Sequence, residues 1–331
     1  MGFVAEVLMT GEGTKTSTLN ENTTFSDGQQ FRVYARRIGE GSNTRVFGDD
    51  GTLVEWDETN GKWVYSPLCY WYWVNQSNYY DFLAVYPDPD GSGQSERMTD
   101  GAGNDIPGNL AIQKSYSITD NYDLLMAGTR RTGADATTRT DKVPLTFRHM
   151  LSAVKVVVTN ESEAASLTLN SIKFDNLIHS ANAKVTIDAT GQPEFSWIDT
   201  QRKSDEVTVY TNSSDPALTT SSRTFDPAAY DLFIPADLTV AIDGSLNPDS
   251  SKLPHLIINF TPAGDSAIER SIPLPDIHKS RYGTDDPLLE WEPGRKYTYN
   301  ISIRLDGGVI VTVITTEWDE IIAETPGLLI E

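Results

Sequence analysis

The feature that most restricts how this chain can fold is the period of two in its short apolar segments. Across residues 297–305 every second residue is apolar, and the turn residues Asp306, Gly307 and Gly308 lead into a second alternating segment that starts at Val309. Successive side chains of a β-strand point to opposite faces of a sheet, so this period is typical of a strand with one buried face. Glycine tolerates the positive φ of a tight turn. The segment therefore predicts a β-hairpin.

The same alternation runs through most of the chain and predicts an all-β protein. The apolar segments are short and are separated by clusters of Gly, Asp, Asn and Pro, and no apolar stripe with helical spacing is sustained. Many short strands with turns between them are typical of β-sandwiches and barrels. Between Leu169 and Ile172 the apolar phase slips by one residue, which predicts a β-bulge near Asn170.

The length of the chain and a central loop predict two domains. The chain has 331 residues, which is enough for two cores of ordinary size. Residues 128–142 are rich in Gly, Thr and charged side chains, as an exposed loop is, and a strongly β-forming run follows at 153–158. We therefore expect an N-terminal β-sandwich domain at residues 1–150 and a C-terminal one at residues 151–331.

The net charge and the hydropathy of the chain argue against a nucleic acid partner and a membrane span. The formal net charge is −21, which repels nucleic acid phosphates and anionic headgroups, so we expect no nucleic acid partner. No apolar segment is long enough to span a bilayer, so we expect no direct membrane span.

The single cysteine, Cys69, is interpreted as a buried structural thiol. The chain starts without a signal-peptide pattern, which leaves open a cytosolic protein or an exported one whose signal is not part of this sequence.

Local sequence patterns for catalysis are absent. The histidines occur singly, without the HxH or HExxH spacing of a zinc site, and are interpreted as structural. They are His149, His179, His255 and His278. No GxSxG, Walker or Rossmann glycine motif is present, and no pair among the 47 acidic residues stands out as a glycosidase site. We expect no enzymatic activity and no cofactor, and keep a hydrolase whose site is assembled only by the fold as an alternative.

One acidic loop has part of a calcium-binding pattern. Asp88, Asp90 and Ser92 place oxygen ligands at alternate positions, with Gly93 at the sixth. The twelfth position is Thr99, where a calcium loop has glutamate. We interpret the loop as an acidic turn after a strand and keep ion binding as the alternative.

A run of aromatic residues, Tyr-Trp-Tyr-Trp at 70–73, allows two interpretations. If Trp71 and Trp73 are exposed, they can stack on sugar rings and form a glycan-binding surface. In a strand these two tryptophans share one face while Tyr70 and Tyr72 share the other, so that one pair enters the core. We prefer the second interpretation.

Several segments resemble the fimbrillin family, whose members are pilus subunits of anaerobic gut and oral bacteria. The aromatic run is followed by an apolar strand that ends in Tyr-Pro, and a later Val-Pro-Leu-Thr-Phe-Arg-His-Met-Leu-Ser stretch is similar to the most recognisable part of the family. The segments are 25–33, 70–73, 80–87, 123–127, 143–152 and 291–299, with Trp318 after them. Each motif is weak by itself, but their order covers most of the chain.

The resemblance implies both a fold and a mode of assembly. It implies two transthyretin-like β-sandwich domains in tandem, a lipoprotein precursor, and a place in a fimbrium at the cell surface and outer membrane. It also implies that a trypsin-like protease removes the first strand and that a terminal segment of the next subunit fills the groove, which is strand addition to a sheet edge. The implied partners are other pilus subunits and a host or bacterial surface ligand.

The chain has candidates for each part of this assembly. The first strand is predicted to be displaced, and Lys15 in the loop after it is the candidate processing site, where the family usually has arginine. The alternating residues of that strand are Phe3, Ala5, Val7 and Met9. The candidate donor tail follows Trp318, and its apolar residues are Ile321, Ile322, Leu328, Leu329 and Ile330. Two alternatives stay open: the tail completes its own domain, or the protein is a surface glycan-binding adhesin or pilus-tip module on the same fold.

Overall fold

The computed structural model describes most of the chain, and in the described part every regular element is a β-strand apart from two short 3-10 turns. These turns are η1 (Ser250–Lys252) and η2 (Leu274–Asp276). The all-β class expected from the sequence is confirmed. The described residues are 2–7, 29–39, 42–47, 50–69, 78–87, 94–99, 105–120, 122–132, 142–162, 165–213, 217–219, 221, 223–246, 249–281, 284–304 and 308–318.

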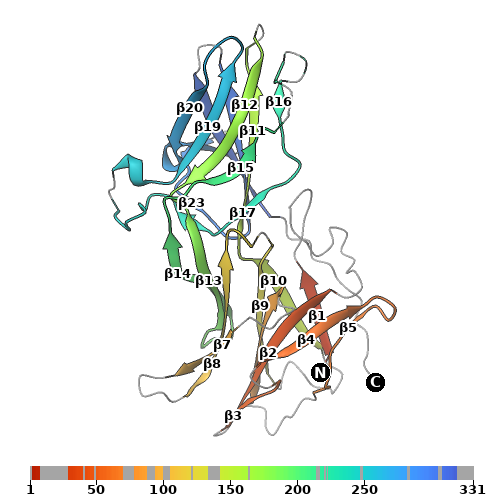
Figure 1. The fold of residues 1–331 in the computed structure, drawn as a ribbon. Helices are drawn as coiled ribbons and strands as arrows, with labels where there is room; N and C mark the ends of the chain where they lie inside the picture. Colours follow the sequence, from red (N-terminus) through yellow and green to blue (C-terminus); the bar gives the residue numbers. More distant parts are fainter. Residues whose placement is uncertain are drawn as a thin grey trace.

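An eight-stranded sheet, called here the N-terminal sheet, forms the lower lobe in Figure 1. Its strands, in spatial order, are β1 (Gly2–Val7), β10 (Lys142–His149), β9 (Leu125–Thr132), β6 (Tyr79–Tyr86), β2 (Gln30–Gly39), β4 (Thr52–Asp57) and β5 (Lys62–Val64), with β3 (Ser42–Arg45) paired to β2. The central strand β6 is buried almost throughout because both of its faces are covered. One face carries a core that includes Phe31, Trp63, Phe82 and Phe147.

The other face of the N-terminal sheet is covered by a four-stranded sheet, called here the cover sheet. Its order is β14 (Pro193–Arg202), β13 (Ile178–Ile187), β8 (Asp105–Ser117) and β7 (Gln94–Thr99). Leu83 and Val85 of β6 share a buried cluster with Ile112 of β8 and Val185 of β13. These residues occupy alternate positions of their strands, so the period of two in the sequence directs one row of each strand into this core.

The upper lobe in Figure 1 is a sandwich of two further sheets. One sheet contains β16 (Thr224–Phe225), β11 (Ser152–Asn160), β24 (Arg295–Ile303), β25 (Val309–Glu317), β21 (His278–Arg281) and β22 (Thr284–Pro287), with β17 (Asp231–Phe233) paired to β11. The facing sheet contains β15 (Val207–Thr211), β12 (Leu167–Asp175), β19 (His255–Pro262) and β20 (Ile268–Pro273), and a separate pair is formed by β18 (Ala236–Asp237) and β23 (Glu290–Trp291). Phe174, Ile258 and Tyr299 lie in the core between the two sheets.

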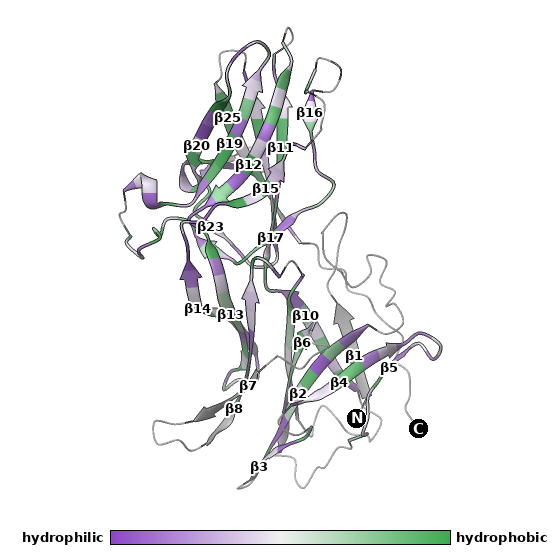
Figure 2. Cartoon of the chain, in the orientation of Figure 1, coloured by the Kyte–Doolittle hydropathy of each residue, from purple (hydrophilic) through white to green (hydrophobic). Residues whose placement is uncertain are grey.

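Two local predictions are confirmed in this sandwich. The alternating segments around residues 306–308 form the antiparallel strands β24 and β25, paired from Ile303 with Val309 to Arg295 with Glu317. The register of β12 with β19 shifts between Leu169 and Ser171, where the apolar phase slips. Figure 2 shows the resulting alternation of hydrophobic and hydrophilic residues along the strands of this lobe.

The chain does not keep to one lobe on each side of Met150. The β13–β14 hairpin follows β12 of the upper lobe, yet β13 pairs with β8 of the lower lobe, from Ala111 with Thr186 to Ser117 with Ser180. Figure 1 shows this hairpin extending downward from the sandwich. Strands from both sides of Met150 therefore share one sheet and one core. The division into residues 1–150 and 151–331 stays a prediction.

Candidate functional site

The first strand lies at the edge of the N-terminal sheet and is held there by one ladder. β1 pairs in parallel with β10, from Gly2 with Lys142 to Val7 with Phe147, and it also lies close to β5 at the opposite end of the strand order. The antiparallel pairing of β10 with β9 covers only Phe147, Arg148 and His149. Within the described residues, 142–146 therefore pair with β1 alone, and removing β1 would leave this part of β10 without a strand neighbour.

Beneath this edge lies a row of large apolar side chains. Val143, Leu145 and Phe147 are completely buried and belong to the core of the N-terminal sheet. Phe147 packs edge-to-face on Phe31, with ring centroids 5.2 Å apart, and Phe31 packs in the same way on Trp63. The register places Phe3, Ala5 and Val7 opposite Val143, Leu145 and Phe147 respectively. The apolar residues of the β1 sequence thus have the same register as the apolar row of β10.

The other predicted site residues lie outside the described part of the chain. Met9 and Lys15 follow β1 in the sequence, and Trp71 and Trp73 precede β6. The remaining members of this set are Asp88, Asp90, Ser92, Ile321, Ile322, Leu328, Leu329 and Ile330. Processing at Lys15, glycan contact, ion binding and strand donation by the tail all stay predictions.

The connection between the lobes is packed tightly around His149 and Met150. The His149 ring stacks on Trp318 with ring centroids 3.9 Å apart and planes 8° apart, and both side chains are buried. Trp197 of β14 donates its indole N–H to the Met150 carbonyl at 2.9 Å. His149 Nδ1 lies 2.8 Å from Asp123 Oδ2, and both side chains are buried. His149 thus packs within the junction, in line with the structural role expected from its isolated position in the sequence.

Hydrogen bonds to main-chain carbonyls join the same junction to the upper lobe. The Gly294 N–H donates to the Leu151 carbonyl at 2.8 Å, and the Trp318 N–H donates to the Gly294 carbonyl at 2.9 Å. The Ser152 hydroxyl donates to the Glu292 carbonyl at 2.8 Å. Gly294 has a φ of +71°, which a residue with a side chain rarely adopts, so glycine permits this turn. The point where the chain leaves β25 is therefore fixed at the lobe boundary.

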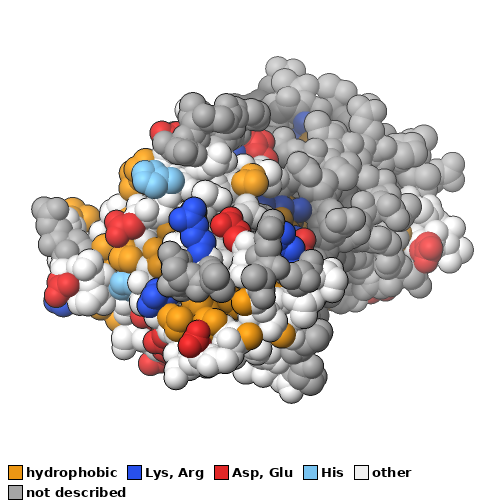
Figure 3. Space-filling view, turned by 90° about the horizontal axis from the view of Figure 1, so that it is seen from above, with side chains coloured by type: hydrophobic (Ala, Val, Ile, Leu, Met, Phe, Trp, Pro, Cys, Tyr) orange, Lys and Arg blue, Asp and Glu red, His pale blue; other side chains and the backbone are white. Residues whose placement is uncertain are grey.

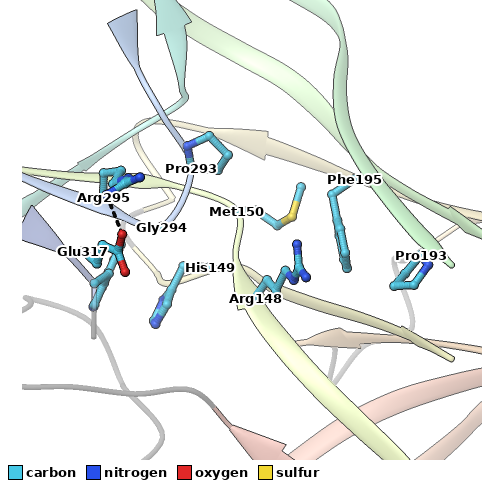
Figure 4. Close-up of a pocket in the computed structure, with 10 residues that line it drawn as sticks. Arg148, His149, Met150, Pro193, Phe195, Pro293, Gly294, Arg295 and Glu317 are labelled. Carbon is cyan, nitrogen blue, oxygen red and sulfur yellow. Dashed lines mark hydrogen bonds and ion pairs between the residues drawn. The ribbon is translucent and has the colours of Figure 1, made fainter. Parts of the chain in front are cut away.

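A cleft of about 490 Å³ opens beside the junction, between β10, β14 and the start and end of the β24–β25 pair. Figure 4 shows Arg148 and Phe195 on one side of it and Arg295 with Glu317 on the other. Its lining residues are Arg148, His149, Met150, Pro193, Phe195, Pro293, Gly294, Arg295, Glu317 and Trp318. Clefts of this size accommodate small ligands or side chains of a partner. Sequence reasoning missed this cleft because its walls come from segments far apart in the chain.

The two arginines of the cleft differ in their pairing. Arg295 is ion-paired with Glu292 at 3.0 Å and with Glu317 at 2.9 Å. Arg148 is exposed, and its guanidinium lies over the Phe195 ring, 5.2 Å from the centroid. Among the residues that the structure describes, Arg148 has neither a carboxylate partner nor a side-chain hydrogen bond.

The cleft lacks the groups of a hydrolase or a metal site. Among the described residues that line the cleft, Glu317 is the only carboxylate, whereas a glycosidase needs an acid and a second carboxylate across the cleft. In the described residues, no three His, Cys, Asp or Glu side chains gather as metal ligands would. On the face seen from above, Lys and Arg side chains lie among acidic and hydrophobic ones rather than in one basic patch (Figure 3). No helix among the described elements has the length and apolar character to cross a bilayer.

Comparison with known proteins gives one decisive match. The model of the fimbrillin-like family matches residues 14–318. The chain belongs to the fimbrillin-like family. The resemblance noted in the sequence is thus confirmed over most of the length of this fimbrillin. A search of curated proteins found no match.

Solved structures similar to this fimbrillin include fimbrial proteins. A fimbrial protein from Bacteroides vulgatus is 16% identical, covers 96% of this chain and 99% of its own, and aligns with a TM-score of 0.51. A fimbrilin from Porphyromonas gingivalis is 10% identical, with 96% and 98% covered and a TM-score of 0.44. The tip fimbrial protein Mfa3 of the same organism is 10% identical, with 95% and 99% covered and a TM-score of 0.40. The Bacteroides vulgatus protein shares the fold of this chain.

Proposed function

We propose that this fimbrillin is a non-enzymatic structural subunit of a cell-surface pilus, assembled when proteolysis releases β1 and a terminal segment of another subunit replaces it. Family membership supports the pilus role. The observation that carries the assembly mechanism is the position of β1, which lies at a sheet edge and has a single ladder, to β10. The sheet would thus lose β1 without losing a strand from its middle.

The exchange has a physical driving force. Loss of β1 opens the sheet edge beside the row Val143, Leu145 and Phe147 and leaves the main-chain groups of residues 142–146 without a strand partner. Burying one large apolar side chain stabilises a protein by about 1.5–3 kcal/mol, and unpaired main-chain groups need new partners. A strand that supplies apolar side chains and main-chain hydrogen bonds satisfies both requirements, and the tail after Trp318 is apolar enough to be the candidate donor.

A disulfide across the β1–β10 ladder tests this proposal directly. Glu6 is paired with Thr146, which is exposed, so Glu6→Cys with Thr146→Cys in a Cys69→Ser background places the bridge outside the apolar row. Cysteines paired across a ladder have the Cα separation that a disulfide needs. After trypsin treatment, we expect the reduced protein to form ladders on a non-boiled gel and the oxidised protein to stay monomeric.

Two further variants separate the steps of the mechanism. Lys15→Ala should abolish both cleavage and assembly if Lys15 is the processing site, and a chain that ends at Trp318 should be cleaved but fail to assemble. The Cys69→Ser protein without the new cysteines is the matched control. If the oxidised protein polymerises as well as the reduced one, release of β1 is not required and the exchange mechanism is wrong.

A further inference from the structure

The edge of the cover sheet is open at β14. This strand pairs with β13 and, in the part of the chain that the structure describes, with no strand on its other side. At the hairpin turn the Asp188 N–H donates to the Gln192 carbonyl at 2.9 Å. Antiparallel pairs alternate between hydrogen-bonded and non-bonded, so counting from this closing pair directs the main-chain groups of Phe195 and Trp197 away from β13.

The position of Pro193 agrees with this direction of the main-chain groups of β14. It is paired with Ile187, one position beyond the closing pair, and its missing N–H therefore falls on the open side of the strand. The ladder between β13 and β14 is regular from Pro193 to Ile198, and its register shifts occur beyond that point. The regular half of the open edge is thus the half that borders the cleft at the junction.

Arg148 lies in the cleft, where its guanidinium can bind an anion beside the open edge of β14. Phe195 contributes its ring to the cleft wall, and Arg148 lies over that ring. A guanidinium held on an aromatic face is pre-organised and keeps its N–H donors available at its rim. In a chain of net charge −21, an exposed arginine that forms no ion pair with a carboxylate among the described residues is an available cation.

We propose that the open edge of β14 and Arg148 together form a docking surface for an extended acidic segment of another polypeptide. The segment adds as a strand along Phe195 and Trp197, and one of its carboxylates pairs with the Arg148 guanidinium in the cleft. Main-chain hydrogen bonds supply affinity in this mode of recognition, and the carboxylate sets the register. The β14 edge belongs to the cover sheet, and Arg148 follows the last residue of β10 that pairs with β1, so the surface is present in the unprocessed monomer and its formation does not require strand exchange.

Binding of a short peptide to the unprocessed protein tests this inference. The probe is a seven-residue peptide of alternating Thr and Val with one central Glu, acetylated and amidated so that its termini carry no charge. Isothermal titration should give a Kd below about 1 mM. Arg148→Met keeps the apolar stem and removes the charge, and we expect it to weaken binding at least about tenfold, as loss of a charge-assisted hydrogen bond does. Arg304→Met, at an exposed arginine that pairs with Glu161 in the upper lobe, is the matched control.

Two altered peptides keep the protein unchanged, so they test the inference even if a variant folds poorly. A peptide with Lys in place of Glu should bind at least about tenfold more weakly, and one N-methylated at alternate residues should lose binding because it cannot complete the ladder. The proposal is overturned if the Glu peptide does not bind, if the Lys peptide binds equally well, or if N-methylation or Arg148→Met leaves affinity unchanged.

Discussion

A buried ion pair within the N-terminal sheet lies beside the cover sheet, and Arg130→Met tests its importance. Asp81 of β6 is fully buried, and Arg130 of β9 donates to both of its carboxylate oxygens at 2.6 and 2.9 Å. Arg130 also donates to the Ala189 carbonyl at 3.3 Å, at the tip of the β13–β14 hairpin. On the other side of Asp81, the register places Arg36 of β2 opposite it. The pair thus lies where the two sheets meet.

The expected loss follows from the burial of Asp81. Removing one partner of a buried ion pair costs about 3–5 kcal/mol, because the remaining charge is left without compensation. Arg36 stays beside the carboxylate in the variant, so we expect a loss at the lower end, about 3 kcal/mol. Asp81→Asn with Arg130→Met removes the carboxylate that Arg130→Met alone leaves without this partner, and should recover part of this loss.

The pH dependence gives an independent check. Burial raises the pKa of Asp81, although Arg130 and Arg36 oppose the shift, and the hydrogen bond to Asp81 raises the pKa of Arg130. A carboxyl whose folded pKa exceeds its unfolded value of about 3.9 holds a proton more tightly when folded, so it costs stability as pH rises through this window. Without Arg130 the shift is larger, and the deficit of the variant should shrink as pH falls from about 7 to about 5.

Urea unfolding of wild type, both single variants and the double variant, followed by tryptophan fluorescence, measures these free energies. The cycle should give a coupling energy between Asp81 and Arg130 of at least about 1 kcal/mol. A loss below about 1 kcal/mol for Arg130→Met, or a coupling near zero, would show that the pair contributes no more than an exposed one.

Three further substitutions test the packing at the lobe junction and the sheet contact. Trp197→Phe removes the indole donor to the Met150 carbonyl and should destabilise the protein by about 1 kcal/mol in urea unfolding; no change would mean that water replaces this bond. Trp318→Ala empties a buried position and should cost about 3–5 kcal/mol, measured in the same way, with Trp318→Phe losing clearly less. Gly128→Ala puts a Cβ 2.9 Å from the Pro193 Cβ, so it should lower stability by about 1–3 kcal/mol; a neutral effect would show that the β14 end moves freely.

Local features of the fold could be predicted where neighbouring residues decide them. The β24–β25 pair and the bulge in β12 follow from the apolar period, its phase slip and the turn residues, which act over a few residues. The all-β class follows in the same way. Family membership could also be predicted from the order of several motifs, although no single one of them is specific.

Long-range pairing could not be predicted in this way. The parallel ladder of β1 with β10 joins segments separated by most of the N-terminal lobe, and an alternating strand fits any sheet edge with a matching apolar row. The crossing of the β13–β14 hairpin to pair with β8 has the same origin. The ion pair of Asp81 with Arg130 and the hydrogen bond of Arg130 to Ala189 also join residues far apart in the chain, so the sequence did not predict them.

The sequence by itself determined the all-β class, the apolar face of many strands and the family, whereas residues 128–132, predicted as part of a loop, belong to strand β9. Only the tertiary structure decided that β1 closes an edge by a single ladder, that β14 leaves one open, and that Arg148 and Phe195 meet at a cleft. The physical reason is that alternation specifies the face of each strand through local geometry, whereas the choice of neighbour depends on the total burial and hydrogen bonding of the whole chain.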